Sequence, residues 1–326
     1  MTTRSPLTIV LGAGNIGDKS IDSMVRHDTP EEVEAFLNAF YERGYRQIDT
    51  ARGYSPHAPG TSEPRLAAAQ AGKRFSIDTK VLSRSSGSHS KNNIKQSIND
   101  SLAALQMTQV DIEYLHHPDR ATPFEETCEA LNEAYLEGKF KRFGLSNYTA
   151  DEVQKFVEIC EARGFVKPTV YQGHYNPVVR GAEKDLFPVL RKHNIAFYAW
   201  SPAAAGFFAG NHKQVQPGGR FDTNHFLGQI YTASYKKPSI ETITDQVREV
   251  AAKHGINGHA AALRWTVYHS ILSATHGDAV IIGASSPAQL TSNLDMIEEG
   301  PLPKEVADAV GALYQKIGDS EIPYHF

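Results

Sequence analysis

TPEEVEAFLNAFYERGYRQIDT, residues 29–50, contains a helix signal followed at once by a strand signal. Thr29 can cap a helix, a proline suits its first position, and two glutamates stand in the first turn. The apolar residues that then recur at the spacing of one helix face are Val33, Phe36, Leu37 and Phe40. Gly44 ends this pattern, and YRQIDT has the short apolar character of a strand. The segment predicts a helix over 30–43 and a strand over 45–50.

The same alternation extends in both directions along the chain. Short apolar runs, rich in β-branched residues, lie at 8–12, 45–50, 75–81, 110–117, 142–147, 169–176, 195–202 and 279–285. The first six intervening segments have helical period, at roughly 30–43, 61–72, 91–106, 124–138, 150–163 and 183–193. Alternation of this kind is typical of a parallel sheet covered by helices, and eight strands close a (β/α)8 barrel.

The seventh unit is irregular. After SPAAAGFFAG, to about residue 238, the sequence is rich in Gly, Asn, His, Lys and Pro, and we expect a long loop without regular structure, used as a lid or binding loop. Helical patterns resume near 240–254 and 258–269, and a further helix is expected at roughly 303–318. No linker or close internal repeat divides the chain, so we expect one domain over residues 1–326. The predicted fold is an α/β class TIM barrel with a long loop after strand seven and an extra C-terminal helix.

The glycines of VLGAGNIG, residues 10–17, offer another interpretation of the fold. Gly12, Gly14 and Gly17 match G-x-G-x-x-G, the spacing that lets a pyrophosphate approach the backbone in a Rossmann domain. Such a domain needs a helix directly after the glycines and an acid at the end of the second strand. Here the first clear helix signal begins only at Thr29, and the candidate acids lie inside that helix. We therefore interpret the glycines as the first barrel strand and its loop.

Composition argues against several classes of protein. The 326 residues carry 33 basic and 37 acidic side chains in no block of one sign, which argues against a nucleic-acid partner. MTTRSPLTIV has no signal-peptide pattern and no segment approaches the roughly 20 apolar residues of a membrane span, so we expect a cytoplasmic protein without a membrane partner. Cys128 and Cys160 are expected to be buried apolar side chains, and the scattered histidines predict no metal site.

Polar residues stand where the predicted strands end, which is where a β/α barrel places its active site. Tyr54 and Lys80 form a chemically sensible pair, because a phenol with a pKa of about 10 is a poor proton donor and a nearby ammonium lowers that pKa. Asp49 can keep the ammonium charged in a closed pocket. His116 could orient a carbonyl oxygen or share the proton. Each residue alone is more often structural, but four at one mouth indicate acid–base chemistry.

These residues occur in motifs that resemble the aldo-keto reductases. IDTARGY contains Asp49 and Tyr54 in the family's D-T-A-x-x-Y pattern, and TK, LHHPD and GLSNY follow in the family's order. TVYQGHYNP, HGDAVIIGASSPAQL and EEGPLP are most similar to the aflatoxin-aldehyde reductase subgroup, which includes succinic semialdehyde reductases. The resemblance spans nearly the whole chain.

The resemblance implies a barrel that binds NADPH across its mouth and passes hydride from the nicotinamide C4 to an aldehyde or ketone. Tyr54 would donate the proton, tuned by Lys80 and Asp49, while His116 aligns the small-molecule carbonyl substrate. The implied cofactor contacts are Ser146, Asn147 and Gln172 at the nicotinamide, Ser201, Ala205, Gly206 and Gly210 along the pyrophosphate, and Arg220, Gly283, Ser285, Gln289 and Asn293 toward the adenosine.

Several positions depart from the family pattern. The usual lysine after the strand-seven glycines is Asn211 here, and the strand-eight loop lacks a cation for a 2′-phosphate, so Arg220 is expected to carry the preference for NADPH. The subgroup's carboxylate-binding arginines are also missing, and Tyr231 lies in the comparable stretch. We expect Tyr231 and Trp200 to contact substrate, although Trp200 could instead pack beneath the loop. The expected substrate is an aldehyde without a carboxylate, such as an aromatic or natural-product aldehyde.

Two other functions fit the same residues. Barrels of this family also serve as nucleotide-binding β subunits of potassium channels, although the intact catalytic set and the lack of an inactivating N-terminal extension argue against that role. A biosynthetic enzyme could use the same four residues for dehydration, isomerisation or imine reduction. The sequence leaves the oligomeric state open, and a homodimer is one alternative because the subgroup is often dimeric.

Overall fold

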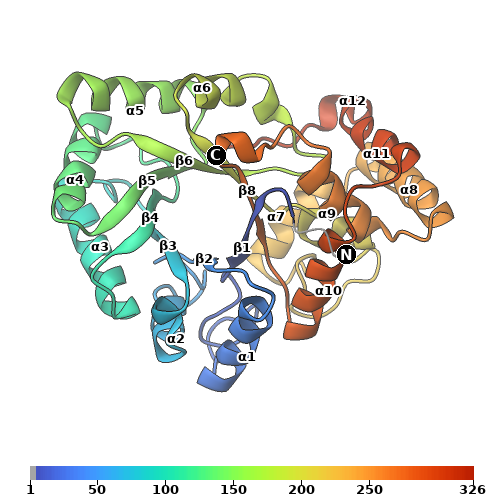
Figure 1. The fold of residues 1–326 in the computed structure, drawn as a ribbon, viewed down its shortest axis with the longest axis horizontal. Helices are drawn as coiled ribbons and strands as arrows, with labels where there is room; N and C mark the ends of the chain where they lie inside the picture. Colours follow the sequence, from blue (N-terminus) through green and yellow to red (C-terminus); the bar gives the residue numbers. More distant parts are fainter. Residues whose placement is uncertain (1–4) are drawn as a thin grey trace.

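The computed structural model describes residues 5–326, and it shows a closed barrel of eight parallel strands in chain order (Figure 1). The first four residues, which belong to the expected domain and to the stretch MTTRSPLTIV, lie outside the described range. The strands are β1 (Thr8–Gly12), β2 (Gln47–Asp49), β3 (Ser76–Val81), β4 (Val110–Leu115), β5 (Phe140–Ser146), β6 (Pro168–His174), β7 (Ala196–Trp200) and β8 (Ala279–Ile282). All eight predicted strands are confirmed, and β1 pairs with both β2 and β8.

Helices cover the outside of this barrel. Those between the first seven strands are α1 (Pro30–Tyr41), α2 (Ser62–Ala68), α3 (Lys91–Leu105), α4 (Phe124–Leu136), α5 (Ala150–Arg163) and α6 (Leu186–Lys192). The remaining helices are α7 (Phe226–Tyr235), α8 (Pro238–Lys253), α9 (Gly258–Tyr268), α10 (Pro287–Glu298), α11 (Lys304–Gly311) and α12 (Leu313–Lys316). In Figure 1, α8, α9, α11 and α12 gather on one side of the barrel. Within residues 5–326, none of the helices combines the length and the apolar character that crossing a membrane requires.

Local signals fix the helix ends that the sequence predicted. The Thr29 side chain accepts from the Glu32 amide, and the Glu32 carboxylate accepts from the Thr29 amide in return. Thr149 and Glu152 form the same reciprocal pair at the start of α5. Each pair satisfies amide groups that a helix start leaves without partners. No helix follows the glycines of β1 before Pro30, so the Rossmann alternative is excluded.

The expectation of a loop without regular structure after β7 is wrong. Helix α7 lies within the stretch that follows SPAAAGFFAG, and a 3₁₀ helix over Ala204–Ala209 precedes that stretch. In α7 a Cβ at Gly228 would come within 1.9 Å of the Asp222 carbonyl oxygen, and Tyr235 is fully buried. Close packing therefore holds this helix, whereas its sequence is poor in strong helix formers and gave no helical signal.

Two smaller differences concern the C-terminal helix and the cysteines. The helix expected near 303–318 is divided into α11 and α12 at Ala312. Cys128 on α4 and Cys160 on α5 are free and buried, as expected. Although they lie far apart in sequence, the two thiols are neighbours, and contact with Cys160 together with burial raises the pKa of the Cys128 thiol.

Alternate residues of each strand point into the barrel. Apolar interior positions are filled by Val10, Ile112, Tyr114, Val170, Ala196, Tyr198, Ala279 and Ile281. A Cβ at Gly144 would lie 2.2 Å from the Tyr114 ring, so only glycine leaves room for this ring. On β2 and β3 the interior positions are polar instead, and the strand register places Asp49 beside Asp78. The barrel interior is thus polar on the side of these two strands.

Candidate active site

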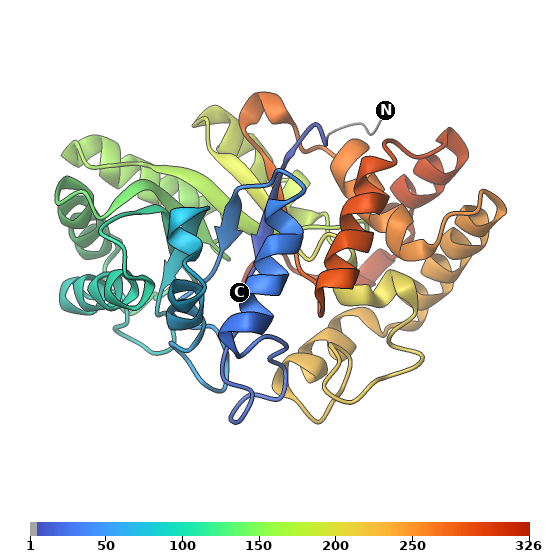
Figure 2. The ribbon, with the colours of Figure 1, turned by 60° about the horizontal axis from the view of Figure 1, so that its bottom comes forward.

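A cavity of about 1410 Å³ opens at the C-terminal ends of the strands. The segments that follow β1 and β7 lie at this same end of the barrel, at the lower edge of Figure 2. Arg26 of the first segment donates to the Gly218 carbonyl of the second, and the Ser23 hydroxyl lies 3.2 Å from Nδ1 of His225. These contacts join the two segments beside the cavity.

Lys80 lies beneath the cavity and connects the predicted catalytic residues. Its ammonium donates to both carboxylate oxygens of Asp49, at 2.8 and 2.7 Å, and to the Thr50 carbonyl at 2.7 Å. It also donates to the Tyr54 hydroxyl oxygen at 3.2 Å. Because this oxygen accepts from Lys80, the Tyr54 proton is left for another acceptor. Asp49 and Tyr54 line the cavity, whereas Lys80 is fully buried below them.

The protonation states of this group follow from burial and from its charges. Burial alone would lower the pKa of Lys80, but Asp49 and Tyr54 together outweigh it and the net pKa is raised, so Lys80 remains an ammonium. Burial raises the pKa of Tyr54, and this effect exceeds the lowering by Lys80. Lys80 does lower the pKa of Tyr54, as expected, but the net pKa is raised because burial has the larger effect. Tyr54 keeps its proton at neutral pH.

His116 lies at the end of β4 and contacts Tyr54. The two rings meet edge to face with centroids 5.6 Å apart, and His117 stacks on His116 at 4.4 Å. Burial, with the charges of His117 and Lys80, lowers the pKa of His116 well below its ordinary value. A neutral imidazole can donate a hydrogen bond but has no extra proton to share. Of the two roles left open by the sequence, the structure favours orientation of a carbonyl oxygen.

Most of the predicted cofactor and substrate residues line this one cavity. They are Ser146, Asn147, Gln172, Trp200, Ser201, Ala205, Gly206, Asn211, Arg220, Tyr231, Gly283, Ser285, Gln289 and Asn293. Gly210 is not among the lining residues, although its neighbour Asn211 is. The structure thus brings these positions together, while their roles toward a ligand stay predictions.

Two amide side chains occupy the centre of the cavity. Asn147 donates to the His116 carbonyl at 2.9 Å, whereas its Oδ1 is buried without a hydrogen-bond partner. Gln172 donates through Nε2 to Oδ1 of Asp49 at 2.7 Å. The buried Asn147 oxygen is therefore an acceptor to which a ligand amide can donate. Gln172 connects β6 to the Asp49 carboxylate.

The far end of the cavity lies between β8, α9 and α10. Asn293 donates to the Gly283 carbonyl at 3.2 Å, and its Oδ1 lies 3.0 Å from Nε2 of His259. Ser285 donates through its amide to the Gln289 side chain at 2.6 Å. The Ser286 side chain caps α10 by accepting from the Gln289 amide. The small and polar residues between β8 and α10 are thus held by hydrogen bonds to one another where they line the cavity.

Strand-end reasoning missed several charged and ring residues of the cavity wall. They are Arg26, Arg84, Phe226, Arg248, His259 and Phe326. Arg248 belongs to helix α8, where it donates to the carbonyls of Phe207 and Phe208. An arginine within a helix does not stand at a strand end, so the search for polar residues at strand ends could not find it. Arg84 follows β3 closely, so a wider window around each strand end would have included it.

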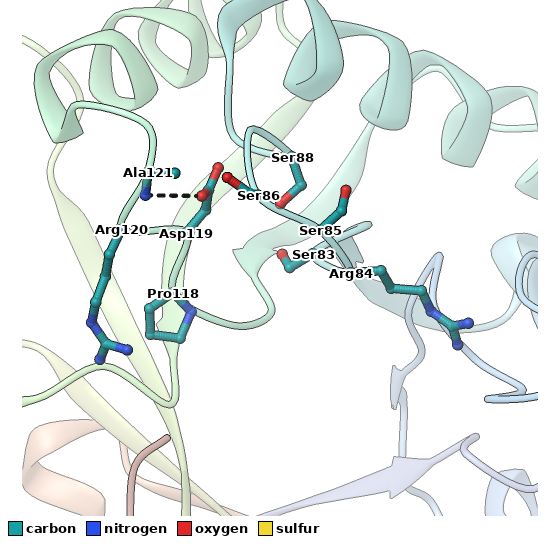
Figure 3. A pocket seen from close by; sticks show the side chains of 9 residues that line it. All are labelled: Ser83, Arg84, Ser85, Ser86, Ser88, Pro118, Asp119, Arg120 and Ala121. Carbon is teal, nitrogen blue, oxygen red and sulfur yellow. Dashed lines mark hydrogen bonds between the residues drawn. The ribbon is translucent and has the colours of Figure 1, made fainter.

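A second cavity of about 390 Å³ adjoins the first and shares Ser83 and Arg84 with it (Figure 3). Asp119 accepts from the amides of Gly87, His89 and Ala121 and from the Thr122 hydroxyl, so its oxygens are occupied. Figure 3 shows Arg84 directed away from Asp119. Nη2 of Arg84 donates to the carbonyls of Gly53 at 2.9 Å and Pro56 at 2.8 Å. Arg84 therefore braces the loop that carries Tyr54.

Comparison with known proteins agrees with this geometry. A model of the aldo/keto reductase family matches residues 8–315. An aldo-keto reductase of Pseudocercospora fijiensis is 38% identical over 297 residues, which cover 88% of this chain and 99% of that protein. Human aldo-keto reductase family 7 member A3 is 37% identical over 99% of this chain and 98% of its own length. Human aflatoxin B1 aldehyde reductase member 2 is 38% identical, with 92% and 86% covered. The chain therefore belongs to the aldo/keto reductase family of oxidoreductases.

Proposed function

We propose that this enzyme reduces an aldehyde or ketone to an alcohol with NADPH, and that Tyr54 donates the proton. The observation that carries the proposal is the position of Lys80, which donates to Asp49 and to Tyr54 directly beneath one large cavity. Membership of a family of carbonyl reductases supports the reaction class.

The cavity wall fits a nicotinamide dinucleotide. A carboxamide N–H has an acceptor in the buried, unpartnered Oδ1 of Asn147. Ala205 and Gly206 both have positive φ, so the backbone after β7 turns sharply where small residues allow a phosphate to approach. Arg220 supplies positive charge on the same wall. Bound NADPH would supply the hydride that reaches the carbonyl carbon.

The side chains of this chain then act on the carbonyl oxygen. Neutral His116 donates a hydrogen bond to that oxygen and holds it beside Tyr54. The Tyr54 O–H proton passes to the oxygen as negative charge develops there. The Lys80 ammonium stabilises the phenolate that remains, and Asp49 keeps Lys80 charged throughout. All four residues thus have a defined part in one proton transfer.

A neutral aromatic aldehyde is the substrate class that the wall supports best. Trp200, Tyr231, Phe226 and Ile230 contribute apolar and ring surface. Arg84 is the cation near His116, but its Nη2 already donates to two backbone carbonyls. That nitrogen is therefore not free to bind a substrate carboxylate. Turnover of a neutral aromatic aldehyde should exceed that of succinic semialdehyde at equal concentration. A clear preference for the acid would refute this assignment.

Replacement of Tyr54 by phenylalanine tests the proposed reaction. Because general-acid catalysis contributes roughly 10²–10⁴-fold, kcat for aldehyde reduction should fall by about that factor in Tyr54→Phe. NADPH oxidation followed by absorbance measures the rate, and fluorescence titration should show unchanged NADPH affinity. Turnover equal to the wild type would remove Tyr54 as the proton donor.

A further inference from the structure

A second buried acid, Asp78, lies beside Asp49 inside the barrel. The register of β2 and β3 places the two residues opposite each other, and Asp78 is 0% exposed. Its Oδ2 accepts from Nε2 of Gln47 at 2.7 Å. Its Oδ1 and the hydroxyl of Tyr114 are both buried without a hydrogen-bond partner. Nothing in the proposed proton transfer uses this carboxyl group.

The cations that surround Asp78 already have partners. Lys80 pairs with Asp49, and Arg142 donates to Asp111 at 2.7 Å and to the Tyr198 hydroxyl at 3.3 Å. The groups that face Asp78 are thus Gln47 and Asp49 from β2, Lys80 from β3, Asp111 and Tyr114 from β4, Arg142 from β5 and Tyr198 from β7. An ionised Asp78 would add a buried negative charge with no cation left to balance it.

Its surroundings therefore favour the protonated form of Asp78. Burial, together with the nearby Asp49 carboxylate, raises the pKa of Asp78 well above its ordinary value. Since Oδ2 accepts a hydrogen bond from Gln47, the proton resides on Oδ1. The unpartnered Oδ1 is then a donor, and the free Tyr114 hydroxyl lies within the same part of the interior.

We propose that Asp78 is a positioning residue of the active site, which by staying neutral leaves Lys80 shared between Asp49 and Tyr54. Loss of its proton at alkaline pH would place a second negative charge beneath Lys80 and weaken Tyr54 as an acid. Only the kinetic test of this inference depends on the proposed function, because it needs the enzyme to reduce an aldehyde. Its direct tests use the protein without cofactor or substrate.

Infrared spectroscopy can detect the proton itself. A protonated carboxylic acid has a carbonyl stretch that a carboxylate lacks, and Asp78→Asn should remove one such band at pH 7. Glu113→Gln is the matched control, because Glu113 is also fully buried, with both oxygens unpartnered and its pKa raised well above normal by burial and by Glu63. It lies on β4 between two interior residues and therefore faces the helices. An unchanged spectrum in Asp78→Asn would show that Asp78 is ionised and would overturn the proposal.

Titration of Tyr54 tests the positioning role. Tyrosinate absorbance, with Tyr54→Phe in the same background subtracted, gives the Tyr54 pKa in each protein. Tyrosinate forms at alkaline pH, where Asp78 has lost its proton, so Asp78→Asn removes a negative charge there and should lower that pKa by about one unit. Glu113→Gln, on the outer face of β4, should change it less. Asp78→Ser, also neutral, serves if the asparagine variant fails to fold. Identical Tyr54 titrations in all proteins would reduce Asp78 to a structural acid and refute the role.

Kinetics separate this inference from the proposed function. Asparagine mimics the neutral acid, so Asp78→Asn should keep kcat at pH 7 within about twofold and change only its alkaline limb. A fall of tenfold or more at pH 7 would contradict a neutral Asp78. If the wild type reduced no aldehyde at all, the proposed function would fail, while the infrared and tyrosinate results would still decide the role of Asp78.

Discussion

Arg220 faces the cavity from the segment after β7, close to a second arginine. Arg26 and Arg220 both line the cavity, and burial together with the charge of Arg220 lowers the pKa of Arg26. An anion between them would relieve this repulsion. The phosphate that distinguishes NADPH from NADH is the anion that fits the proposed function.

Arg220→Ala should therefore weaken NADPH binding selectively. Hydrogen bonds to charged groups contribute about 1.5–3 kcal/mol, so the Kd for NADPH should rise roughly 10- to 100-fold while the Kd for NADH changes little. Fluorescence titration with both cofactors measures the ratio. Arg84→Gln is the control, since Arg84 lies near Tyr54 and should leave the ratio unchanged. Equal losses for both cofactors would show that Arg220 does not recognise the phosphate.

Asp49 and Lys80 were predictable from the ends of the strands, whereas the part played by Asp78 within β3 was not. Asp49 and Lys80 stand where polar side chains are unusual, at the ends of apolar runs, and they meet at 2.7 Å. Asp78 stands in the middle of FSIDTKV, where alternation gives no sign of which face is buried. The partners of a buried acid come from other strands. Their distances depend on strand register, which one sequence does not specify.

The Tyr235 hydroxyl links helix α7 by hydrogen bonds to residues at and after the end of β6. The Tyr235 hydroxyl lies 2.6 Å from Nε2 of His174 and accepts from Asn176 at 3.0 Å. His174 in turn stacks on Trp200 with centroids 4.0 Å apart. The helix beside the cavity is thereby connected to a ring in the cavity wall.

Tyr235→Phe should loosen this helix. Loss of the hydroxyl leaves buried groups of His174 and Asn176 without their partner, at a cost of about 1–3 kcal/mol. Hydrogen exchange of residues 226–235 should become faster, and proteolysis in the segment after β7 should increase. Tyr231→Phe is the control, because Tyr231 stacks on Tyr235 but is only partly buried. Unaltered exchange would show that packing alone holds α7.

Elements with local signals were predicted well, and elements held by distant contacts were not. α1 and α5 begin at capping threonines that the sequence displays. α7 has no side-chain cap and depends on contacts with Asp222 and with β6. Tertiary packing outweighs local propensity in such a helix.

Over the whole molecule, buried ionisable groups act on stability in opposite directions. Burial lowers the pKa of His27 and His89 to about 4 and of His174 to about 3. Unfolded histidines bind protons near 6.5, so their stabilising contribution is complete above that pH and is lost as pH falls toward 4. Asp78 and Glu113 have raised pKa values, so they favour the folded state more as pH falls.

Removal of one buried histidine isolates its part of this balance. Between pH 7 and pH 5, a histidine with a folded pKa of about 4 should destabilise the protein by about 2 kcal/mol. In His89→Gln the free energy of unfolding should therefore change less with acidification than in the wild type, by about that amount. Urea unfolding at the two pH values measures the difference. Parallel changes in both proteins would contradict a neutral His89.

The strand that begins the barrel is paired mainly with the strand that completes it. Four residues of β1, Thr8 to Leu11, are in register with Ala279 to Ile282 of β8, whereas only Leu11 and Gly12 are in register with β2. The partners are separated by about 270 residues of chain, so this contact is among the most costly in loop entropy. During synthesis β1 is made about 270 residues before β8, its main partner. Ring closure then becomes the step at which eight separate strands turn into one cooperative unit.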